Sequence, residues 1–248
     1  MKSATKVRAD QLLVTRALVR SRAEAQARIL AGEVHTGSVR VEKAGQLLAA
    51  DAELVVVPRH RFVSRGGDKL EHALTVFALD VTGLRCVDVG ASTGGFTDCL
   101  LQRGAASVVA IDVGQGQLDP KLLADARVRS LEGVNARNLG AETIGGAAEL
   151  VVVDASFIGL DKLANALASF VVPGGQLVAL VKPQFEAGRE AVKQGRGVIR
   201  DEAVRLAAIG RARDALVAAG FDVVQETDSA VHGPKGNVER FVWARRRP

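Results

Sequence analysis

The sequence of 248 residues contains no tyrosine, and it has only one tryptophan, one methionine and two cysteines. Oxidoreductases that use a nicotinamide cofactor often need a catalytic Tyr-x-x-x-Lys, so the missing tyrosine argues against that class of enzyme. The two cysteines, Cys86 and Cys99, are too few for a disulfide framework in a chain of this size. Because neither has a nearby histidine to activate its thiol, we expect both to be small buried hydrophobic residues.

Histidines are also scarce, and no part of the sequence has the character of a membrane segment. The sequence predicts no metal site, because ligand-like spacing is absent among the four histidines, His35, His60, His72 and His232. No stretch reaches the roughly 18 apolar residues of a membrane span, and no apolar run follows the basic start. We therefore expect a cytoplasmic protein with no membrane partner. The net charge of +5 favours an anionic partner.

The sequence pattern predicts that residues 1–60 form a small basic α+β domain. Apolar residues recur at helical spacing early in this segment, Ser21 opens a second helix as its N-cap, and strand-like runs follow at 39–41 and 54–57. A single arginine on a helix face is most simply a solvated residue. Phosphate contact is favoured for the group of seven cations gathered here, Lys6, Arg8, Arg16, Arg20, Arg22, Arg28 and Arg40.

This segment resembles the small RNA-binding module of ribosomal protein S-four and of many RNA-modifying enzymes. The resemblance is carried by Arg8 and by the run Ser21-Arg-Ala-Glu-Ala-Gln-Ala-Arg-Ile-Leu-Ala-Gly-Glu-Val34. In that family the two helices rest on structured RNA. The sequence departs from the family's pattern at residues 35–37, where a hydrophobic residue is common. The resemblance implies RNA contacts at Arg8, Arg16, Arg20, Ser21, Arg22 and Arg28.

From residue 65 the pattern changes to strands that alternate with helices, so we take 61–64 as a linker and 65–248 as a second domain. The last two β-rich runs, 221–226 and 238–244, are joined by a loop too short for a crossover helix, and should be antiparallel neighbours. A parallel sheet covered on both faces is predicted by the earlier runs, 85–89, 106–111, 150–153 and 176–181. A doubly wound α/β sheet with an antiparallel last strand resembles the methyltransferase variant of this fold.

A glycine-rich stretch, Val87-Asp-Val-Gly-Ala-Ser-Thr-Gly-Gly-Phe96, follows the first of these strands. Its glycines let the backbone approach a ligand, although glycines also serve ordinary turns between a strand and a helix. Asp112 closes the next strand, where a carboxylate can accept hydrogen bonds from an adenosine ribose. These features alone fit a nicotinamide cofactor or S-adenosylmethionine. The candidate cofactor contacts are Asp88, Gly90, Ala91, Ser92, Gly94, Gly95, Asp112 and Asn135.

Two of these positions carry more particular expectations. Asp88 would suit the cationic end of S-adenosylmethionine, which has a sulfonium group and no pyrophosphate. Asn135 is either a contact on the adenine side of the ligand or a turn residue.

Two lysines and two carboxylates stand beside predicted strand or helix ends of the second domain, namely Lys69, Asp154, Lys182 and Glu239. Asp154 and Lys182 follow apolar strands, at the edge where doubly wound folds bind ligands. A lysine directly after five apolar residues is hard to explain by solvation alone, whereas Lys69 could be an ordinary surface lysine. Gathered at one cleft, the four groups can hold a sugar hydroxyl and help to remove its proton. Phe157 either stacks on an extruded base there or is a core aromatic residue.

The glycine-rich stretch resembles the loop of FtsJ-type methyltransferases, and the four polar residues resemble the Lys-Asp-Lys-Glu set of ribose 2′-O-methyltransferases. Over nearly its whole length the chain resembles the TlyA, or haemolysin A, family of ribosomal RNA methyltransferases. The resemblance implies S-adenosylmethionine as cofactor, ribosomal RNA or ribosomal subunits as partner, and a cytidine 2′-hydroxyl as methyl acceptor. Our hypothesis makes Lys182 the base, Lys69 and Asp154 its electrostatic and positioning partners, and Glu239 the orienting group.

Two other functions stay open at this point. One is a haemolysin-like membrane-active protein, although the sequence offers no amphipathic hairpin, membrane helix or secretion signal for it. The other is a non-catalytic RNA-binding protein. Such a protein would keep the basic domain and lose the four polar residues, which this chain retains.

Overall fold

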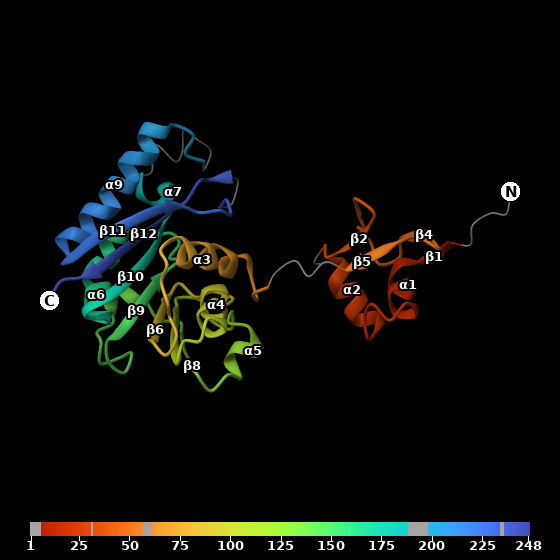
Figure 1. Cartoon of the computed structure of the whole chain (residues 1–248), viewed down its shortest axis with the longest axis horizontal. Coiled ribbons are helices and arrows are strands. Elements are labelled where there is room, and N and C mark those ends of the chain that lie inside the picture. Colours follow the sequence, from red (N-terminus) through yellow and green to blue (C-terminus); the bar gives the residue numbers. More distant parts are fainter. Residues whose placement is uncertain (1–5, 31, 57–60, 188–197, 234–235) are drawn as a thin grey trace. The chain divides into compact units, whose positions relative to one another are not determined.

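The computed structural model describes all residues except 1–5, 31, 57–60, 188–197 and 234–235. The chain divides into two compact units, Met1–Arg61 and Phe62–Pro248 (Figure 1). The second unit includes Phe62, whose side chain is buried in the core of that unit. Residues 57–60, at the end of the first domain predicted from the sequence, lie outside the described residues.

In the first unit, two short helices accompany two small antiparallel sheets. Strand β1 pairs with β4, and β2 lies between β3 and β5. The core includes Leu13, Ile29 and Val34, which are at most 2% exposed. The elements are β1 (Lys6–Arg8), α1 (Ala9–Thr15), α2 (Arg22–Leu30), β2 (Val34–Thr36), β3 (Val39–Arg40), β4 (Leu47–Ala49) and β5 (Leu54–Val56). The predicted strand-like runs at 39–41 and 54–57 contain β3 and β5, whereas β1, β2 and β4 were not predicted from the sequence.

The described part of the second unit is built on a seven-stranded sheet in the order β11-β12-β10-β9-β6-β7-β8. Strand β12 runs antiparallel to both of its neighbours, β10 and β11, whereas the pairs from β10 to β8 are parallel. The strands are β6 (Arg85–Val89), β7 (Ser107–Asp112), β8 (Val128–Glu132), β9 (Ala148–Val153), β10 (Val171–Val181), β11 (Phe221–Asp228) and β12 (Arg240–Arg246). The predicted doubly wound sheet with a reversed last strand is therefore confirmed.

Helices cover both faces of this sheet, and alternate residues of each strand face opposite layers. In β9, Leu150 and Val152 pack in the cluster beneath α3 and α4, whereas Val151 and Val153 pack in the cluster beneath α6 and α9. The helices are α3 (Arg65–Val76), α4 (Gly95–Gln102), α5 (Pro120–Leu123), η1 (Ala136–Asn138), α6 (Leu160–Phe170), α7 (Pro183–Glu186) and α9 (Glu202–Ala218). The near-continuous apolar runs of the central strands follow from burial on both faces.

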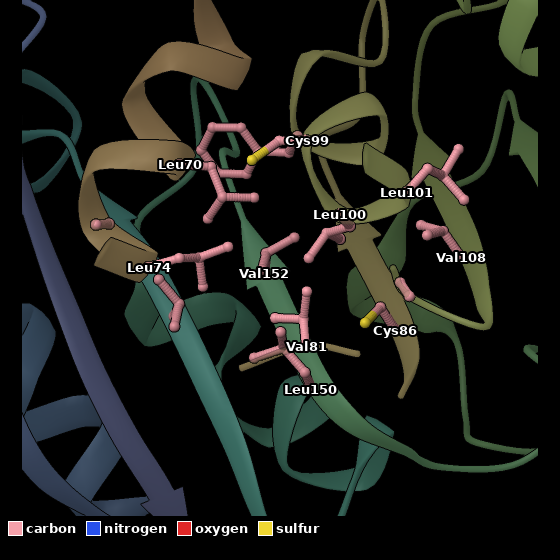
Figure 2. Close-up of a cluster of buried hydrophobic side chains, with 14 of the residues drawn as sticks. Leu70, Leu74, Val81, Cys86, Cys99, Leu100, Leu101, Val108, Leu150 and Val152 are labelled. Atoms are coloured by element: carbon pink, nitrogen blue, oxygen red, sulfur yellow. The ribbon is translucent and has the colours of Figure 1, made fainter. Parts of the chain in front are cut away.

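Both cysteines lie in the cluster beneath α3 and α4, among leucine and valine side chains (Figure 2). Cys86 and Cys99 are each 0% exposed. Burial raises the pKa of the Cys86 thiol to about 12, so this side chain stays protonated at neutral pH. The expectation that the two cysteines act as small buried hydrophobic residues is confirmed.

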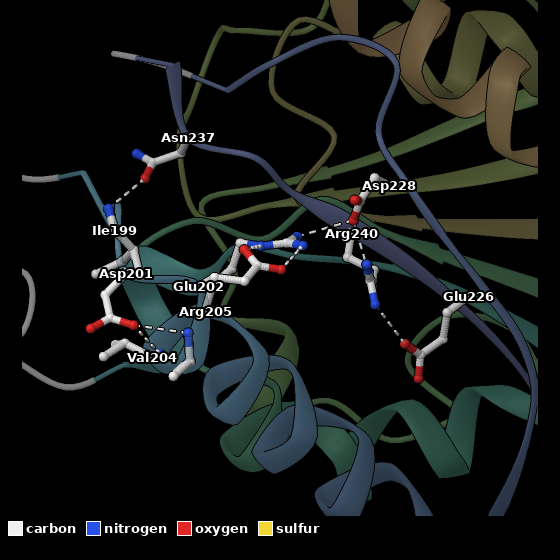
Figure 3. Close-up of polar contacts among 10 residues, drawn as sticks. Ile199, Asp201, Glu202, Val204, Arg205, Glu226, Asp228, Asn237 and Arg240 are labelled. Atoms are coloured by element: carbon white, nitrogen blue, oxygen red, sulfur yellow. Dashed lines mark hydrogen bonds and ion pairs between the residues drawn. The ribbon is translucent and has the colours of Figure 1, made fainter.

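An ion-pair network fixes the place where β12 begins. Arg240, the first residue of β12, donates from Nε to Asp228 of β11 at 2.8 Å, and Arg205 of α9 pairs with the same carboxylate at 3.1 Å (Figure 3). The Arg205 side chain is only 9% exposed and also pairs with Glu202 at 2.8 Å. The network therefore ties α9, β11 and β12 together directly beside Glu239, the residue that precedes β12.

In the part of the chain that the structure describes, none of the helices is both long and apolar enough to cross a membrane.

Candidate active site

Lys69 and Glu239 form a buried ion pair, although 170 positions separate them in the chain. Lys69 lies on α3, which Ser64 caps by accepting from the backbone N–H of Gly66. Its Nζ donates to Glu239 Oε2 at 2.5 Å, and the Glu239 side chain is 0% exposed. Gly233 lies against the same carboxylate, since a Cβ added there would collide with Glu239 Oε1. Lys69 is thus buried and paired, and the alternative of a surface lysine is wrong.

Lys182 and Asp154 form a second ion pair at the carboxyl edge of the sheet. Asp154 directly follows β9 and Lys182 directly follows β10. Lys182 Nζ lies 2.6 Å from Asp154 Oδ1 and 3.3 Å from the Asp154 backbone oxygen. The same Nζ donates to Ser156 Oγ at 2.7 Å. Each lysine therefore has its own carboxylate partner.

The two ion pairs line one cavity of about 610 Å³. The glycine-rich loop forms another wall through Gly90, Ala91, Ser92 and Gly95. Two polar residues that the sequence did not single out also line it, Arg65 and Asn237. Arg65 lies within the Ser64-Arg-Gly-Gly run and Asn237 two positions before Glu239, so nearness to predicted site residues was the available signal. The structure thus brings all four predicted catalytic residues to one place.

The loop between β6 and α4 depends on its glycines for close backbone approach. Gly90 has φ +85°, and a Cβ added there would lie 2.8 Å from the backbone oxygen of Asp154. Gly94 has φ +93° and precedes α4. It lines neither cavity, because it faces Leu118 and Leu122 on the inner side of the loop. Gly94 therefore shapes the turn without reaching the site.

A second cavity of about 680 Å³ lies on the other side of the loop, at the ends of β6, β7 and β9. Asp112 lines it, and its two carboxylate oxygens accept from the backbone N–H groups of Ser92 at 2.8 Å and Gly114 at 2.7 Å. Asn135 lines it too, and its side chain accepts from the backbone N–H of Arg137 as the N-cap of η1. Asn135 is therefore a turn residue and a cavity-lining residue at once.

Asp88 lines neither cavity, so it offers no direct contact to a ligand in them. Its side chain is 0% exposed and accepts a 2.7 Å hydrogen bond from the Thr97 hydroxyl of α4. The predicted direct contact with a cationic ligand is not supported, because Asp88 faces the layer between β6 and α4. Burial raises the pKa of Asp88 to about 7. The hydrogen bond from Thr97 acts in the opposite direction and lowers this pKa, whereas the charge of Asp154 raises it further.

Phe157 stands at the boundary of the two cavities and lines both. Its side chain is 91% exposed, so the alternative of a core aromatic residue is wrong. The backbone of Phe157 has φ +67°, which is unusual for a residue with a side chain. Its ring lies 5.1 Å from the ring of Phe185, just after β10. The exposed Phe157 ring, in contact with the half-buried Phe185 ring, is thus held beside the two lysines.

In the first unit, a buried carboxylate organises two of the predicted RNA-binding arginines. Asp10 is 0% exposed and pairs with Arg8 at 3.0 Å and with Arg22 at 2.8 Å. The Arg8 hydrogen bond is the largest cause of a pKa of Asp10 well below its usual range. The arginine side chains stay 43% and 53% exposed, and a guanidinium group has more donors than these contacts use.

The other predicted RNA-binding residues of this unit are also partly engaged within it. Arg16 donates to two backbone carbonyl groups at 2.6 Å, and Arg28 pairs with Glu33 at 2.9 Å. The Ser21 hydroxyl accepts from the backbone N–H three residues further on, at the start of α2, as the expected N-cap. Arg20 is an exposed residue.

A doubly wound sheet with one reversed strand, and with a cavity at its carboxyl edge, is typical of methyltransferases of the α/β class. The family described as FtsJ-like methyltransferase matches residues 62–246. The fold is also similar to that of an S-adenosylmethionine-dependent methyltransferase from Mesorhizobium loti, with a TM-score of 0.52 and 17% identity over 71% of this chain and 96% of that one.

Closer relatives cover both units. The chain is 44% identical over 244 residues to the 16S/23S rRNA (cytidine-2′-O)-methyltransferase TlyA of Mycobacterium tuberculosis, covering 98% of this chain and 91% of that protein. It is 40% identical to Hemolysin A of Brachyspira hyodysenteriae, over 94% and 97% of the two chains. A solved structure from Streptococcus thermophilus that carries the name hemolysin has a TM-score of 0.76 and 40% identity, over 99% and 90% of the chains. The chain therefore belongs to the TlyA family of FtsJ-like methyltransferases.

Proposed function

We propose that this protein transfers a methyl group from S-adenosylmethionine to the ribose 2′-hydroxyl of a cytidine in ribosomal RNA, within the ribosomal subunits. The relative in Mycobacterium tuberculosis is named for this activity. The observation that carries the proposal is the wall that the two cavities share, formed by Gly90, Ser92, Asp154, Ser156 and Phe157. A methyl donor in one cavity and a nucleotide in the other would meet beside Asp154 and Lys182.

The second cavity fits S-adenosylmethionine. Its volume of about 680 Å³ is in the range of small-molecule sites. Backbone N–H groups hold the Asp112 carboxylate at the end of β7, and its remaining lone pairs can accept from the ribose hydroxyls of the ligand. Gly90 has no side chain to fill the space beside the Asp154 backbone. When bound, S-adenosylmethionine supplies an electrophilic methyl group.

The first cavity supplies the groups that position and deprotonate a hydroxyl. We assign Lys182 as the base, because its Nζ lies at the cavity wall beside Asp154 and Ser156. Asp154 orients the Lys182 amine and limits the cost of its charge during turnover. The Lys69–Glu239 pair is assigned to hold the acceptor ribose, since Lys69 Nζ is fixed by a buried carboxylate. Alignment of hydroxyl and methyl group is the main contribution of such a site.

RNA binding is assigned to the first unit and to the aromatic pair. The exposed guanidinium groups of Arg8 and Arg22 are held by Asp10 in a fixed orientation, which suits contacts to phosphate oxygens. The Phe157 ring offers an exposed face beside the first cavity on which an extruded base can stack. In both assignments the side chains proposed to contact RNA, those of Arg8, Arg22 and Phe157, are exposed.

The proposal is tested by incubating the protein with radiolabelled S-adenosylmethionine and separate small and large ribosomal subunits, followed by nucleotide mapping. We expect label in 2′-O-methylcytidine. Replacing Lys182 by methionine should slow methyl transfer at least about 100-fold, because general-base catalysis is lost. Lys121→Met is a matched control, since that lysine side chain is 68% exposed on α5 and should keep the wild-type rate.

Two results would count against the proposal. One is label that resides only in bases and leaves every ribose unmodified. The other is a Lys182→Met protein that is folded and transfers methyl groups at the wild-type rate.

A further inference from the structure

Lys182 is surrounded by oxygens of two different kinds. Two belong to Asp154, its carboxylate Oδ1 at 2.6 Å and its backbone oxygen at 3.3 Å, and neither carries a hydrogen. The third is the hydroxyl oxygen of Ser156, which accepts from Nζ at 2.7 Å. A hydroxyl can both accept and donate, whereas a carboxylate or a carbonyl oxygen can only accept.

This difference matters when the amine is neutral. The ammonium group donates to the Asp154 backbone oxygen and to Ser156 Oγ, and it forms an ion pair with Asp154 Oδ1. A lysine that acts as a base must first present a lone pair. Neither oxygen of Asp154 can donate to that lone pair. The Ser156 hydroxyl can, by rotating its hydrogen toward Nζ over the same short separation. Ser156 is therefore the partner that suits Lys182 in both of its protonation states.

The other buried lysine has a different environment. Lys69 Nζ donates to the Glu239 carboxylate at 2.5 Å, and that carboxylate is 0% exposed. The hydroxyl contact at Lys182 thus distinguishes the two lysines and favours Lys182 as the proton acceptor.

Ser156 also has the access that a proton carrier needs. It is an exposed residue and lines both cavities, between the expected positions of the methyl donor and of the nucleotide. It lies two positions after Asp154, so the chain that positions the carboxylate also positions the hydroxyl. A ribose hydroxyl in the first cavity can reach Ser156 without displacing Asp154 from Lys182.

We propose that Ser156 relays the proton from the ribose 2′-hydroxyl to Lys182, an inference that rests on the proposed function. The 2′ oxygen gives its proton to Ser156 Oγ while Ser156 gives its own proton to Lys182 Nζ. The freed electron pair on the 2′ oxygen forms the bond to the methyl carbon as the carbon–sulfur bond breaks, with its electrons left on sulfur. Lys182 ends as an ammonium group that donates to Ser156, which is the arrangement observed, and then gives its extra proton to water.

The test compares wild type with Ser156→Ala and Ser156→Thr in single-turnover methyl transfer to ribosomal subunits. The alanine variant should be about 100-fold slower, and the threonine variant should recover most of the rate because it keeps a hydroxyl. Ser169→Ala is the matched control: it removes a serine hydroxyl that donates to the Ala166 carbonyl within α6, and it should leave the rate unchanged.

Mixtures of light and heavy water separate a relay from a structural role. The dependence of the methyl-transfer rate on the fraction of heavy water should indicate two protons in transit in the wild type and one in Ser156→Ala. Calorimetric affinity for S-adenosylmethionine and unfolding followed by Trp243 fluorescence should be the same in both proteins, since neither measures proton transfer.

Wild-type rate in Ser156→Ala would overturn the relay. So would a slow alanine variant with an unchanged dependence on heavy water and no rescue by threonine. Both results leave the proposed function standing, whereas a wild-type protein that methylates no ribose would remove the function and the relay together.

Discussion

The free energy of unfolding of the second unit should depend on pH through the titration of Asp88. Replacing Asp88 by asparagine should remove most of that dependence. The Asp88 carboxylate is 0% exposed, and Thr97 donates to its Oδ2. Its Oδ1 is buried and has no hydrogen-bond partner among the described residues. Burial, helped by the nearby charge of Asp154, raises the pKa of this group from 3.8 to about 7. The folded chain therefore holds the proton over a range of pH in which the unfolded chain has lost it.

The sign follows from which state binds more protons. Between pH 3.8 and about 7 the folded protein is protonated at Asp88 and the unfolded chain is not, so the free energy of unfolding falls as the pH rises. Above about pH 7 both states are ionised and the contribution is constant. At about 1.4 kcal/mol for each pH unit, the full loss is about 4 kcal/mol, of which about 3 kcal/mol falls above about pH 5.

Asparagine cannot ionise, so the variant lacks this loss. Its amide oxygen can accept from Thr97, but its buried NH₂ group would face the position of the unpartnered Oδ1, at a cost of about 1–3 kcal/mol at every pH. At about pH 5 the variant should therefore be level with wild type or less stable by up to about 2 kcal/mol, and at about pH 8.5 it should be more stable by about 1–3 kcal/mol.

Urea denaturation followed by tryptophan fluorescence measures this effect in the right unit. The only tryptophan, Trp243, is 9% exposed and lies on β12 in the second unit. Asp125→Asn is the control, because its carboxyl pKa is about 2 owing to the hydrogen bond from Arg127, so its titration ends well below pH 5. Stability curves of wild type and Asp88→Asn that stay parallel from about pH 5 to about pH 8.5 would refute the reasoning.

Two further substitutions test the geometry of the site. Lys69→Met leaves the buried Glu239 without its cation and should lower the free energy of unfolding by about 3–5 kcal/mol. Adding Glu239→Gln to this variant should restore much of the lost stability. Equal losses in the single and double variants, measured by urea denaturation, would contradict the pairing. Gly90→Ala puts a Cβ 2.8 Å from the Asp154 backbone oxygen and should weaken cofactor binding about tenfold or more in calorimetry. Gly174→Ala, with φ +76° and open space around it, should leave the affinity unchanged, and equal effects of both substitutions would refute the close-contact argument.

Much of the second unit could be predicted because its signals are local. The apolar strands are long enough to be seen, and the loop between 226 and 238 is too short for a crossover helix, so the reversed last strand followed from length alone. Strand β8 was missed, since Val128–Glu132 lies at the sheet edge and its residues are mostly only half-buried. An edge strand with little buried surface lacks the apolar pattern that marks a central strand.

The candidate site was predictable in its residue types and less so in its contacts. Asp154 and Lys182 follow apolar strands, and parallel strands place their carboxyl ends at one edge of the sheet. Asp88 was misjudged because its position next to the loop says nothing of the direction of its side chain. The role of Ser156 did not follow from the sequence, since its contact with Lys182 depends on the neighbouring strand.

The sequence by itself determined the order of the long apolar strands, the glycine-rich loop and the ionisable groups at strand ends. Those features depend on residues near one another in the chain. Only the tertiary structure decided that Lys69 pairs with Glu239, that Lys182 is shared by Asp154 and Ser156, and that Asp88 is buried. The physical reason is that side chains alternate between the faces of a sheet, so strand register and helix packing select the partners of each charge.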